Sequence, residues 1–471
     1  MRAVRRALLG LLLLAVLAAG WLALTGGQAR SQLNDARTDL QAVRDALSAR
    51  DLPAAREAAE RAAERTQTAE RRTSDPVWRL TGQIPLLGRS IETTTGVAAV
   101  ADELTSEALP GLLDAVDAID PDQLRRPDGT IDLTTVEAAT APLRRSSEFI
   151  RDASERLSRL PRSLVAGPVQ DAREELDQQT DDLVAAVDGA RLATEIAPLA
   201  LGKDKPRRFF VLVQQNSESR GTGGLPGGFV ILEARDGRLR VTDQGSNAEL
   251  RNEVIPPPLG VPADYVQHYT GFGAFGIWQN INVSPDLPVV SLVIADRWKR
   301  QTGQSIDGVI ALDAQALQDL LRGAGPIPLP GGGSLAPDGV VDYLAVGQYR
   351  DFAPPDGSTG IDRSPERKQV LESISQAATQ RLVTGGGDSE QLLRGLIAAV
   401  RPGHLRMTST DPVLGTLLHE AGVDGALPEG EAPVAYPVVF NSTGGKLQHW
   451  LDPSASYTAG PCEGPRRRST I

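Results

Sequence analysis

The chain has 471 residues, enough for two or three domains, and 41% of them are hydrophobic, so substantial cores can form. Its formal net charge of −11 argues against a nucleic-acid-binding protein, which needs a basic surface. The single cysteine and the scattered histidines do not supply the ligand spacing of a zinc site.

The N-terminus combines basic residues with an uncharged apolar run. Arg2, Arg5 and Arg6 precede residues 7–24, a run just long enough to span a bilayer. The arginines should stay in the cytoplasm, which places the rest of the chain outside. A cleaved signal peptide is the alternative, although its apolar core is usually shorter. We therefore predict a cytoplasmic tail and single-pass membrane anchor over residues 1–28, and both interpretations export the remainder.

Residues 29–200 are expected to form a helical bundle or a coiled-coil stalk. Apolar residues recur there at the alternating spacing of three and four that marks a heptad seam, at Leu33, Ala36, Leu40, Val43 and Leu47. Asp51 is expected to cap a second helix that ends near residue 70. Further helices are predicted at 90–118, 133–160 and 168–195. We expect this region to be structural, with a partner-binding helix face as the alternative.

Residues 201–440 are expected to form an α/β domain, because predicted strands and helices alternate along the chain. An irregular loop is predicted at 255–288. Strands are predicted at 209–213, 228–234, 239–242, 308–312 and 435–440. Helices are predicted at 288–302, 314–322, 343–349, 365–382, 391–400 and 410–421. The predicted fold class is therefore α+β or α/β with a mixed sheet.

Residues 441–471 are interpreted as the start of a further β-rich module. Cys462 is the only cysteine, and an odd cysteine in an exported protein suggests a missing partner. The last residues, Arg-Arg-Arg-Ser-Thr-Ile, are typical of the start of a strand, so we expect the chain to be a fragment. A free thiol near a frayed terminus is the alternative.

The segment from Arg207 to Phe229 carries the clearest signal of a site. An apolar strand leads into a polar cluster containing Arg220 and then into a glycine-rich loop, which lets a backbone approach a ligand closely. No Gly-Lys-Ser/Thr follows these glycines, which excludes a Walker loop, and no Gly-x-Ser-x-Gly elbow is present. The glycines of residues 271–276 match a dinucleotide motif, but no clear strand precedes them and no helix follows.

Arginines and acids on the predicted loops and helix starts form the candidate anion site. Guanidinium groups match phosphate oxygens, a helix start favours anions, and Asp362 would hold Mg²⁺, the expected cofactor. The candidate catalytic residues are Arg220, Arg350, Asp362, Arg363 and Arg367. The alternative is a salt-bridged loop cluster without a ligand.

Several motifs resemble domain-of-unknown-function family 4012 (DUF4012). They are the run from Phe209 to Phe229, the Asn282-Val-Ser-Pro-Asp-Leu-Pro segment, Asp307 to Asp313, and Arg363 to Lys368. The resemblance covers about residues 200–385. That family has no settled activity, so the resemblance implies no particular reaction.

The same region is distantly similar to the LytR–CpsA–Psr proteins, which transfer polyprenyl-pyrophosphate-linked glycopolymers to the bacterial wall. The order of elements agrees: Arg220, the 307–313 strand, then Arg350 and the 362–368 segment. In that family the arginines bind pyrophosphate and an acid helps to bind Mg²⁺. One family motif has no clear counterpart, and the nearest residues are Arg251 and Glu253. The similarity implies a LytR–CpsA–Psr-like mixed-sheet domain.

Together these features predict a membrane-anchored, extracytoplasmic cell-envelope protein. Its α/β domain is expected to bind a phosphorylated, lipid-linked glycan, and whether it also transfers that glycan as a glycopolymer phosphotransferase is left open. In the catalytic version, Arg220, Arg350, Arg363 and Arg367 would neutralise a polyprenyl pyrophosphate. The expected partners are the membrane, that lipid, and envelope proteins that contact the helices. The alternative is a non-catalytic scaffold or adhesion protein that acts through its helical region.

Overall fold

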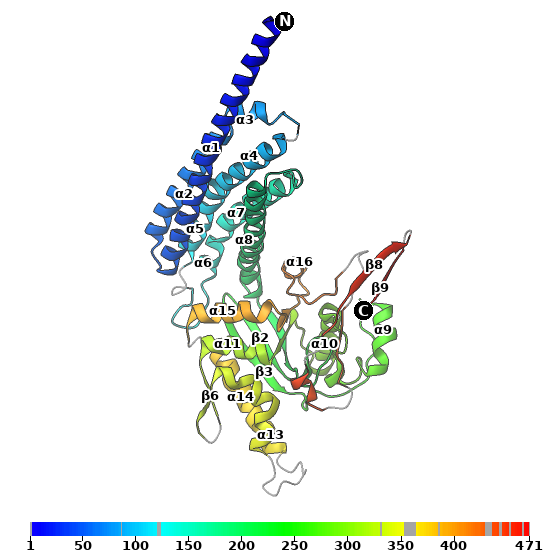
Figure 1. Cartoon of the computed structure of the whole chain (residues 1–471). Helices are drawn as coiled ribbons and strands as arrows, with labels where there is room; N and C mark the ends of the chain where they lie inside the picture. The colour runs from blue at the N-terminus through cyan, green and yellow to red at the C-terminus, as the bar shows by residue number, and fades with distance from the viewer. Residues whose placement is uncertain are drawn as a thin grey trace. The chain divides into compact units, whose positions relative to one another are not determined.

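The computed structural model describes residues 2–85, 87–119, 124–329, 332–352, 364–384, 387–428, 436–441, 445–451, 454–463 and 466–470. The fold is α+β, with many helices and a mixed five-stranded sheet (Figure 1). The chain divides into two compact units. The helical unit comprises Met1–Asp120 and Thr134–Glu195, and the α/β unit comprises Pro121–Leu133 and Ile196–Ile471.

The helical unit is built from long helices, as predicted (Figure 1). Its helices are α1 (Arg2–Ser48), α2 (Leu52–Thr73), α3 (Pro76–Thr81), α4 (Leu87–Glu103), α5 (Leu109–Ala118), α6 (Leu133–Ala138), α7 (Thr140–Arg159) and α8 (Gly167–Ala200). The predicted cap is confirmed, because the Asp51 carboxylate accepts from the Ala54 amide at 3.0 Å. Val43 of the predicted seam packs against Ala55, Ala58 and Ala59 of α2.

Two of the predicted helices are interrupted a few residues before a proline. A π-helical turn, η1 (Leu104–Ala108), separates α4 from α5, and a break at Ala139 separates α6 from α7. Pro110 and Pro142 lack the amide that would bond to the carbonyl four residues earlier. The predictions of single helices over 90–118 and 133–160 were therefore wrong at these points.

The predicted membrane anchor lies mostly outside what the structure describes. The chain is helical from Arg2 onward in α1, but the side chains of residues 1–15 are outside the described part. Within the described part, no helix combines the length and the apolar character needed to cross a membrane. The anchor over residues 7–24 therefore stays a prediction from the sequence.

The five-stranded sheet has the order β3-β2-β1-β4-β7. Its strands are β1 (Arg207–Gln215), β2 (Leu225–Arg235), β3 (Arg238–Ser246), β4 (Gly308–Asp313) and β7 (Leu405–Met407). β1 pairs with β4 in parallel, and the other neighbours pair antiparallel. Asp236 and Gly237, with φ of 49° and 79°, turn β2 into β3, as a type I′ hairpin requires.

One face of the sheet carries the main core of the α/β unit. Phe210, Phe229 and Trp298 contact one another there, with ring centroids 5.4–5.7 Å apart. Helix α10 (Leu287–Thr302) covers this face (Figure 1), and α9 (Ala263–Tyr269) joins the same core through Tyr265. α9 was predicted as irregular loop, but burial of Tyr265 in this core stabilises a helix there.

Helices α11 (Ala314–Ala324) and α14 (Ser364–Thr384) lie against the opposite face and form a second core with Leu312 of β4. α15 (Ser389–Val400) packs on α11. Other short elements include α12 (Val340–Asp342), a π-helical turn η5 (Tyr343–Gly347), α13 (Gln348–Asp351), α16 (Pro412–Glu420), and a small pair, β5 (Ile327–Pro328) with β6 (Ser334–Leu335).

The C-terminal region differs from the prediction in one respect. The predicted strand at 435–440 is wrong for its described part, because residues 436–440 belong to no strand. Phe440 instead packs against the main core and Asn441 is buried, so tertiary contacts replaced sheet pairing there. β8 (Thr458–Glu463) and β9 (Arg466–Thr470) form an antiparallel hairpin that contains Cys462.

Candidate functional site

A cavity of about 490 Å³ lies between the second face of the sheet and helices α11 and α14. Its floor is made by alternate apolar side chains of the central strands: Val211, Val213, Val230, Leu232, Ile310 and Leu312. Protein interiors pack with few voids larger than a water molecule. Pockets for organic ligands span about 300–1,000 Å³, so this cavity has the size of a binding pocket.

The pocket is long, because it follows helix α14 for most of its length. Leu371, Ile374, Ala378 and Leu382 line it and share one face of the helix, since they are three or four residues apart. From Arg367 to Val383, both of which line the pocket, a helix rises by about 24 Å. A linear apolar chain fits this shape better than a compact molecule does.

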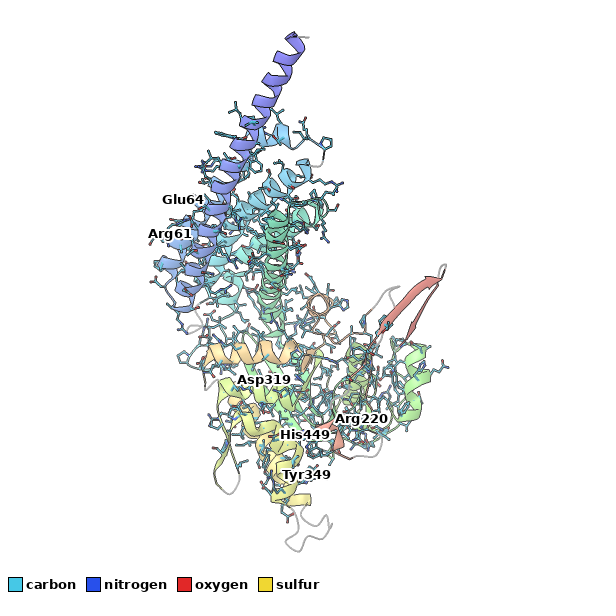
Figure 2. The ribbon with its side chains drawn as sticks, in the orientation of Figure 1. Arg61, Glu64, Arg220, Asp319, Tyr349 and His449 are labelled. Carbon is cyan, nitrogen blue, oxygen red and sulfur yellow. The ribbon has the colours of Figure 1, made fainter. Side chains whose placement is uncertain are left out.

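Cations gather near the start of α14, where the lining becomes polar. Arg367, Lys368 and Lys446 all line the pocket there. The guanidinium of Arg367 lies 4.7 Å from the centre of the Tyr349 ring, and the Lys446 ammonium lies 5.5 Å from it. Figure 2 shows Tyr349 close to the C-terminal segment that carries His449. The start of a long helix also favours an anion. Three cations against two lining acids, Glu218 and Glu372, leave this end, the pocket mouth, with a small excess of positive charge.

Hydrogen bonds fix the position of Arg367. Its Nη1 donates to Oε1 of the buried Gln348 at 2.6 Å. The Gln348 amide nitrogen donates to the carbonyl of Leu344, which also accepts from Gln215 Nε2 at 2.5 Å. Because the Arg367 guanidinium can only donate, the oxygen of Gln348 faces the arginine and its amide nitrogen faces the Leu344 carbonyl. Gln215, the last residue of β1, therefore supports the pocket mouth indirectly.

The predicted arginines do not line one pocket. Arg220 is buried elsewhere, where it donates to the carbonyls of Asn441 and Ser219 at 2.8 and 3.0 Å. Burial lowers the pKa of Arg220. Arg350 is exposed on α13 and is not among the lining residues, whereas Arg367 is. Asp362 and Arg363 lie outside the described residues. Figure 2 shows Arg220 well apart from Tyr349.

The glycine-rich loop packs against its own chain. A Cβ atom on Gly221 would lie 2.2 Å from the Ser284 carbonyl carbon, and one on Gly224 would lie 2.3 Å from that of Gln215. Asn282 Nδ2 donates to the Thr222 hydroxyl at 2.9 Å and so ties the loop to the 282–284 segment. These two glycines are needed for close contact between backbone segments, whereas the sequence suggested an approach to a ligand.

Three acids line the pocket as well, Glu218, Asp313 and Glu372, and the first two serve other groups. Glu218 lies 3.3 Å from Lys446, and Asp313 caps α11 through the amides of Gln315 and Ala316 at 2.9 and 3.0 Å. In the described part of the chain, no three His, Cys, Asp or Glu side chains gather as a metal site would require. Arg251 and Glu253 form an exposed ion pair at 3.3 Å. No step through Mg²⁺ follows from these residues.

His404 links strand β7 to the end of β4. Its Nδ1 lies 2.7 Å from Asp313 Oδ2, and this hydrogen bond raises the pKa of His404, an effect that Asp319 adds to and Arg406 opposes. A raised pKa contributes stability that is complete below the unfolded value of ~6.5 and is lost as pH rises through the folded value.

His404→Gln should therefore destabilise the protein more in mild acid than in alkali. Thermal melting of both proteins across this pH range measures the difference. His268→Gln, on the exposed end of α9, is the control and should show no such trend. A constant difference for His404→Gln would contradict the proposed linkage.

The sequence did not identify several residues of the pocket mouth. Tyr349 and Gln348 directly precede Arg350, which was selected as a candidate from the sequence, but no sequence pattern gave a reason to select these two residues. Lys446 belongs to a segment more than two hundred residues after Glu218, and no spacing rule connects the two. Lys368 was noticed as part of a family-like motif and lines the pocket as well.

Residues 204–349 match the model of a family described as Protein of unknown function (DUF4012). The predicted resemblance is confirmed over this segment. It includes β1, the glycine-rich loop, Gln348 and Tyr349, and it ends before Arg367 and Lys446. No curated protein matches the chain.

Proposed function

We propose that the α/β unit binds an amphipathic lipid, with its apolar chain in the pocket and a phosphorylated head group at the mouth. The observation that carries this proposal is the combination of an elongated apolar cavity with three cations, Arg367, Lys368 and Lys446, at one end. A purely apolar ligand would not need the cations, and a free phosphate would not need the cavity.

Elementary energetics favours this class of ligand. Apolar surface gains about 25 cal/mol for each Å² that leaves water, and the floor and the α14 wall supply that surface. Arginine pairs with phosphate oxygens through two parallel donors. Lys368 is exposed, so a glycan attached to the phosphate would extend into solvent without a binding cleft of its own.

The distant similarity to the LytR–CpsA–Psr proteins suggests which lipid this is. We infer a polyprenyl phosphate or pyrophosphate that carries a glycan, bound by a single-pass, extracytoplasmic cell-envelope protein with its anchor at residues 7–24. In the transfer reaction on the pyrophosphate, an acceptor hydroxyl would lose its proton to solvent and form a bond to the glycan-linked phosphorus. The bond from that phosphorus to the bridging oxygen would break, and polyprenyl phosphate would leave with that oxygen. The pocket supports binding directly, and the transfer step rests on the similarity.

Binding of a defined isoprenoid tests the proposal. The full chain is titrated with geranylgeranyl pyrophosphate and, in parallel, with geranylgeraniol, which has the same chain and no charge. We expect saturable binding of both ligands and tighter binding of the pyrophosphate. If neither ligand binds at high micromolar concentration, the proposal is wrong and the scaffold interpretation gains.

Arg367 and Arg350 should differ in how substitution by glutamine changes ligand affinity. Arg367→Gln should weaken pyrophosphate binding about tenfold, since hydrogen bonds to charged groups contribute about 1.5–3 kcal/mol, and should leave alcohol binding unchanged. Arg350→Gln is the matched control and should change neither affinity, because Arg350 is exposed and does not line the pocket. Equal losses in both variants would show that general surface charge attracts the ligand.

A further inference from the structure

The C-terminal region of the α/β unit folds back onto the loop that follows β1. Described residues 436–441 and 445–451, here called the strap, make these contacts. The Asn441 amide donates to the Ser219 carbonyl at 3.2 Å, and Arg220 donates to the Asn441 carbonyl at 2.8 Å. The strap is thus joined to the loop in both directions.

Arg220 is held entirely by groups of its own chain. Besides the carbonyls of Ser219 and Asn441, its guanidinium contacts Asn280 Oδ1 at 3.2 Å and lies 5.8 Å from the ring centre of Phe440. An arginine that is buried this way cannot also reach a ligand in a pocket that it does not line. Its contacts with Phe440 and Asn441 instead fix the strap.

The strap carries a lysine to the pocket mouth. Lys446 follows Asn441 closely, lines the pocket and lies over Tyr349. Its ammonium pairs with Glu218 at 3.3 Å, and both side chains are largely buried, at 18% and 16% exposure. Displacing Glu218 would leave its carboxylate largely buried without the lysine, which is costly, so a head-group phosphate has to compete with Glu218 for the Lys446 ammonium.

We propose that Lys446 binds the anionic head group, and that Arg220 is a positioning residue that holds the strap, and hence Lys446, at the mouth. This inference rests on the proposed function and assigns a role to a segment beyond the matched family region. In this proposal Arg220 positions the strap and does not contact the pyrophosphate. Glu218 competes with the head group for Lys446.

The test compares each variant by its affinity ratio, the affinity for geranylgeranyl pyrophosphate divided by that for geranylgeraniol, in the full chain. Lys446→Gln should lower the ratio about tenfold. Glu218→Gln should raise it severalfold, because it frees Lys446 and removes a repelling charge. Lys299→Gln, on α10 at the opposite face of the sheet, is the control and should leave the ratio unchanged.

Arg220→Lys separates the positioning role from direct contact. Arg220→Lys should lower the affinity ratio as Lys446→Gln does. The double variant Arg220→Lys/Lys446→Gln should have the same affinity ratio as Lys446→Gln alone, because both substitutions act through the Lys446 ammonium. Asn441→Ala, which removes the side-chain bond to the Gly445 carbonyl, should act in the same direction with Arg220 intact. Melting curves show whether Arg220→Lys folds, and if it does not, Asn441→Ala tests the positioning role in its place.

Each outcome decides the proposal. An unchanged ratio in Lys446→Gln overturns the head-group role, and an unchanged ratio in both Arg220→Lys and Asn441→Ala overturns the positioning role. Additive losses in the double variant would mean that Arg220 contacts the ligand itself. Absence of binding of either ligand by the unaltered chain would instead overturn the proposed function and this inference together.

Discussion

Ser375→Leu should weaken the binding of geranylgeranyl pyrophosphate at least tenfold and should also raise the melting temperature of the protein. Ser375 lines the pocket on α14, between Leu371 and Ala378. A larger apolar side chain there occupies space that the lipid chain needs. It also fills part of the cavity in the free protein, which contributes about 1 kcal/mol and shifts the melting temperature upward by about 2–4 °C.

The opposite signs make this experiment informative. Loss of binding that comes with lower stability would indicate damage to the fold, whereas loss with higher stability indicates a filled site. Ser373→Leu is the matched control on the same helix: Ser373 does not line the pocket, and its hydroxyl donates to the Gln369 carbonyl at 2.9 Å. Ligand affinity and thermal melting are measured for both. Unchanged affinity in Ser375→Leu would show that the chain does not enter this cavity.

Asp411→Asn should destabilise the α/β unit by about 2 kcal/mol, because the buried guanidinium of Arg207 loses one of two carboxylate partners and keeps only Asp204, 2.8 Å from its Nη2. The side chain of Arg207, at the start of β1, is 1% exposed, and its Nη1 lies 2.9 Å from Asp411 Oδ2. Lys205 lies 3.1 Å from the same oxygen. Asparagine keeps an oxygen that can accept from the amides of Val413 and Leu414 at the start of α16, so the substitution removes the charge and retains the helix cap.

The effect should depend on pH in a defined direction. The Leu414 amide, followed by Lys205 and Arg207, holds the pKa of Asp411 well below its usual range. A depressed pKa contributes stability that is complete above the unfolded value of ~3.9 and is lost as pH falls through the folded value.

Urea unfolding at neutral and strongly acidic pH measures this dependence. The difference between the wild type and Asp411→Asn should shrink in acid. Asp296→Asn is the control, because its pair with Arg300 lies within one turn of α10 with Arg300 half exposed, and it should cost about 0.5 kcal/mol or less. A small, pH-independent effect of Asp411→Asn would contradict the buried-pair account.

Much of the secondary structure could be predicted because local signals were strong. The run from Phe209 to Val213 is apolar and bounded by polar residues, and it forms the centre of β1. Asp51 and Pro53 set the start of α2. The predictions failed where tertiary contacts decide: Tyr265 places a helix in an expected loop, and Phe440 and Asn441 hold an expected strand in an irregular conformation.

The site was predicted less well than the fold. Arg367 and the polar run that contains Gln215 were recognised from their residue types. The pocket was not, since alternate residues such as Val211 and Ile310 have the same sequence pattern whether a helix or a cavity covers them. Asp362 and Arg363 lie outside the described residues, so their assignment to the site stays a prediction.

The sequence by itself determined most of the elements, the mixed α+β class, the family resemblance and the presence of cations suited to an anion. Only the tertiary structure decided which cations come together. The loop from residue 216 to 224 turns Arg220 away from the pocket, and Arg220 bonds there to Asn441 of the strap. The strap in turn brings Lys446 to Tyr349 at the pocket mouth. The physical reason is that local sequence fixes backbone conformation through steric and hydrogen-bonding rules, whereas the direction of a long charged side chain depends on partners that are distant in the chain.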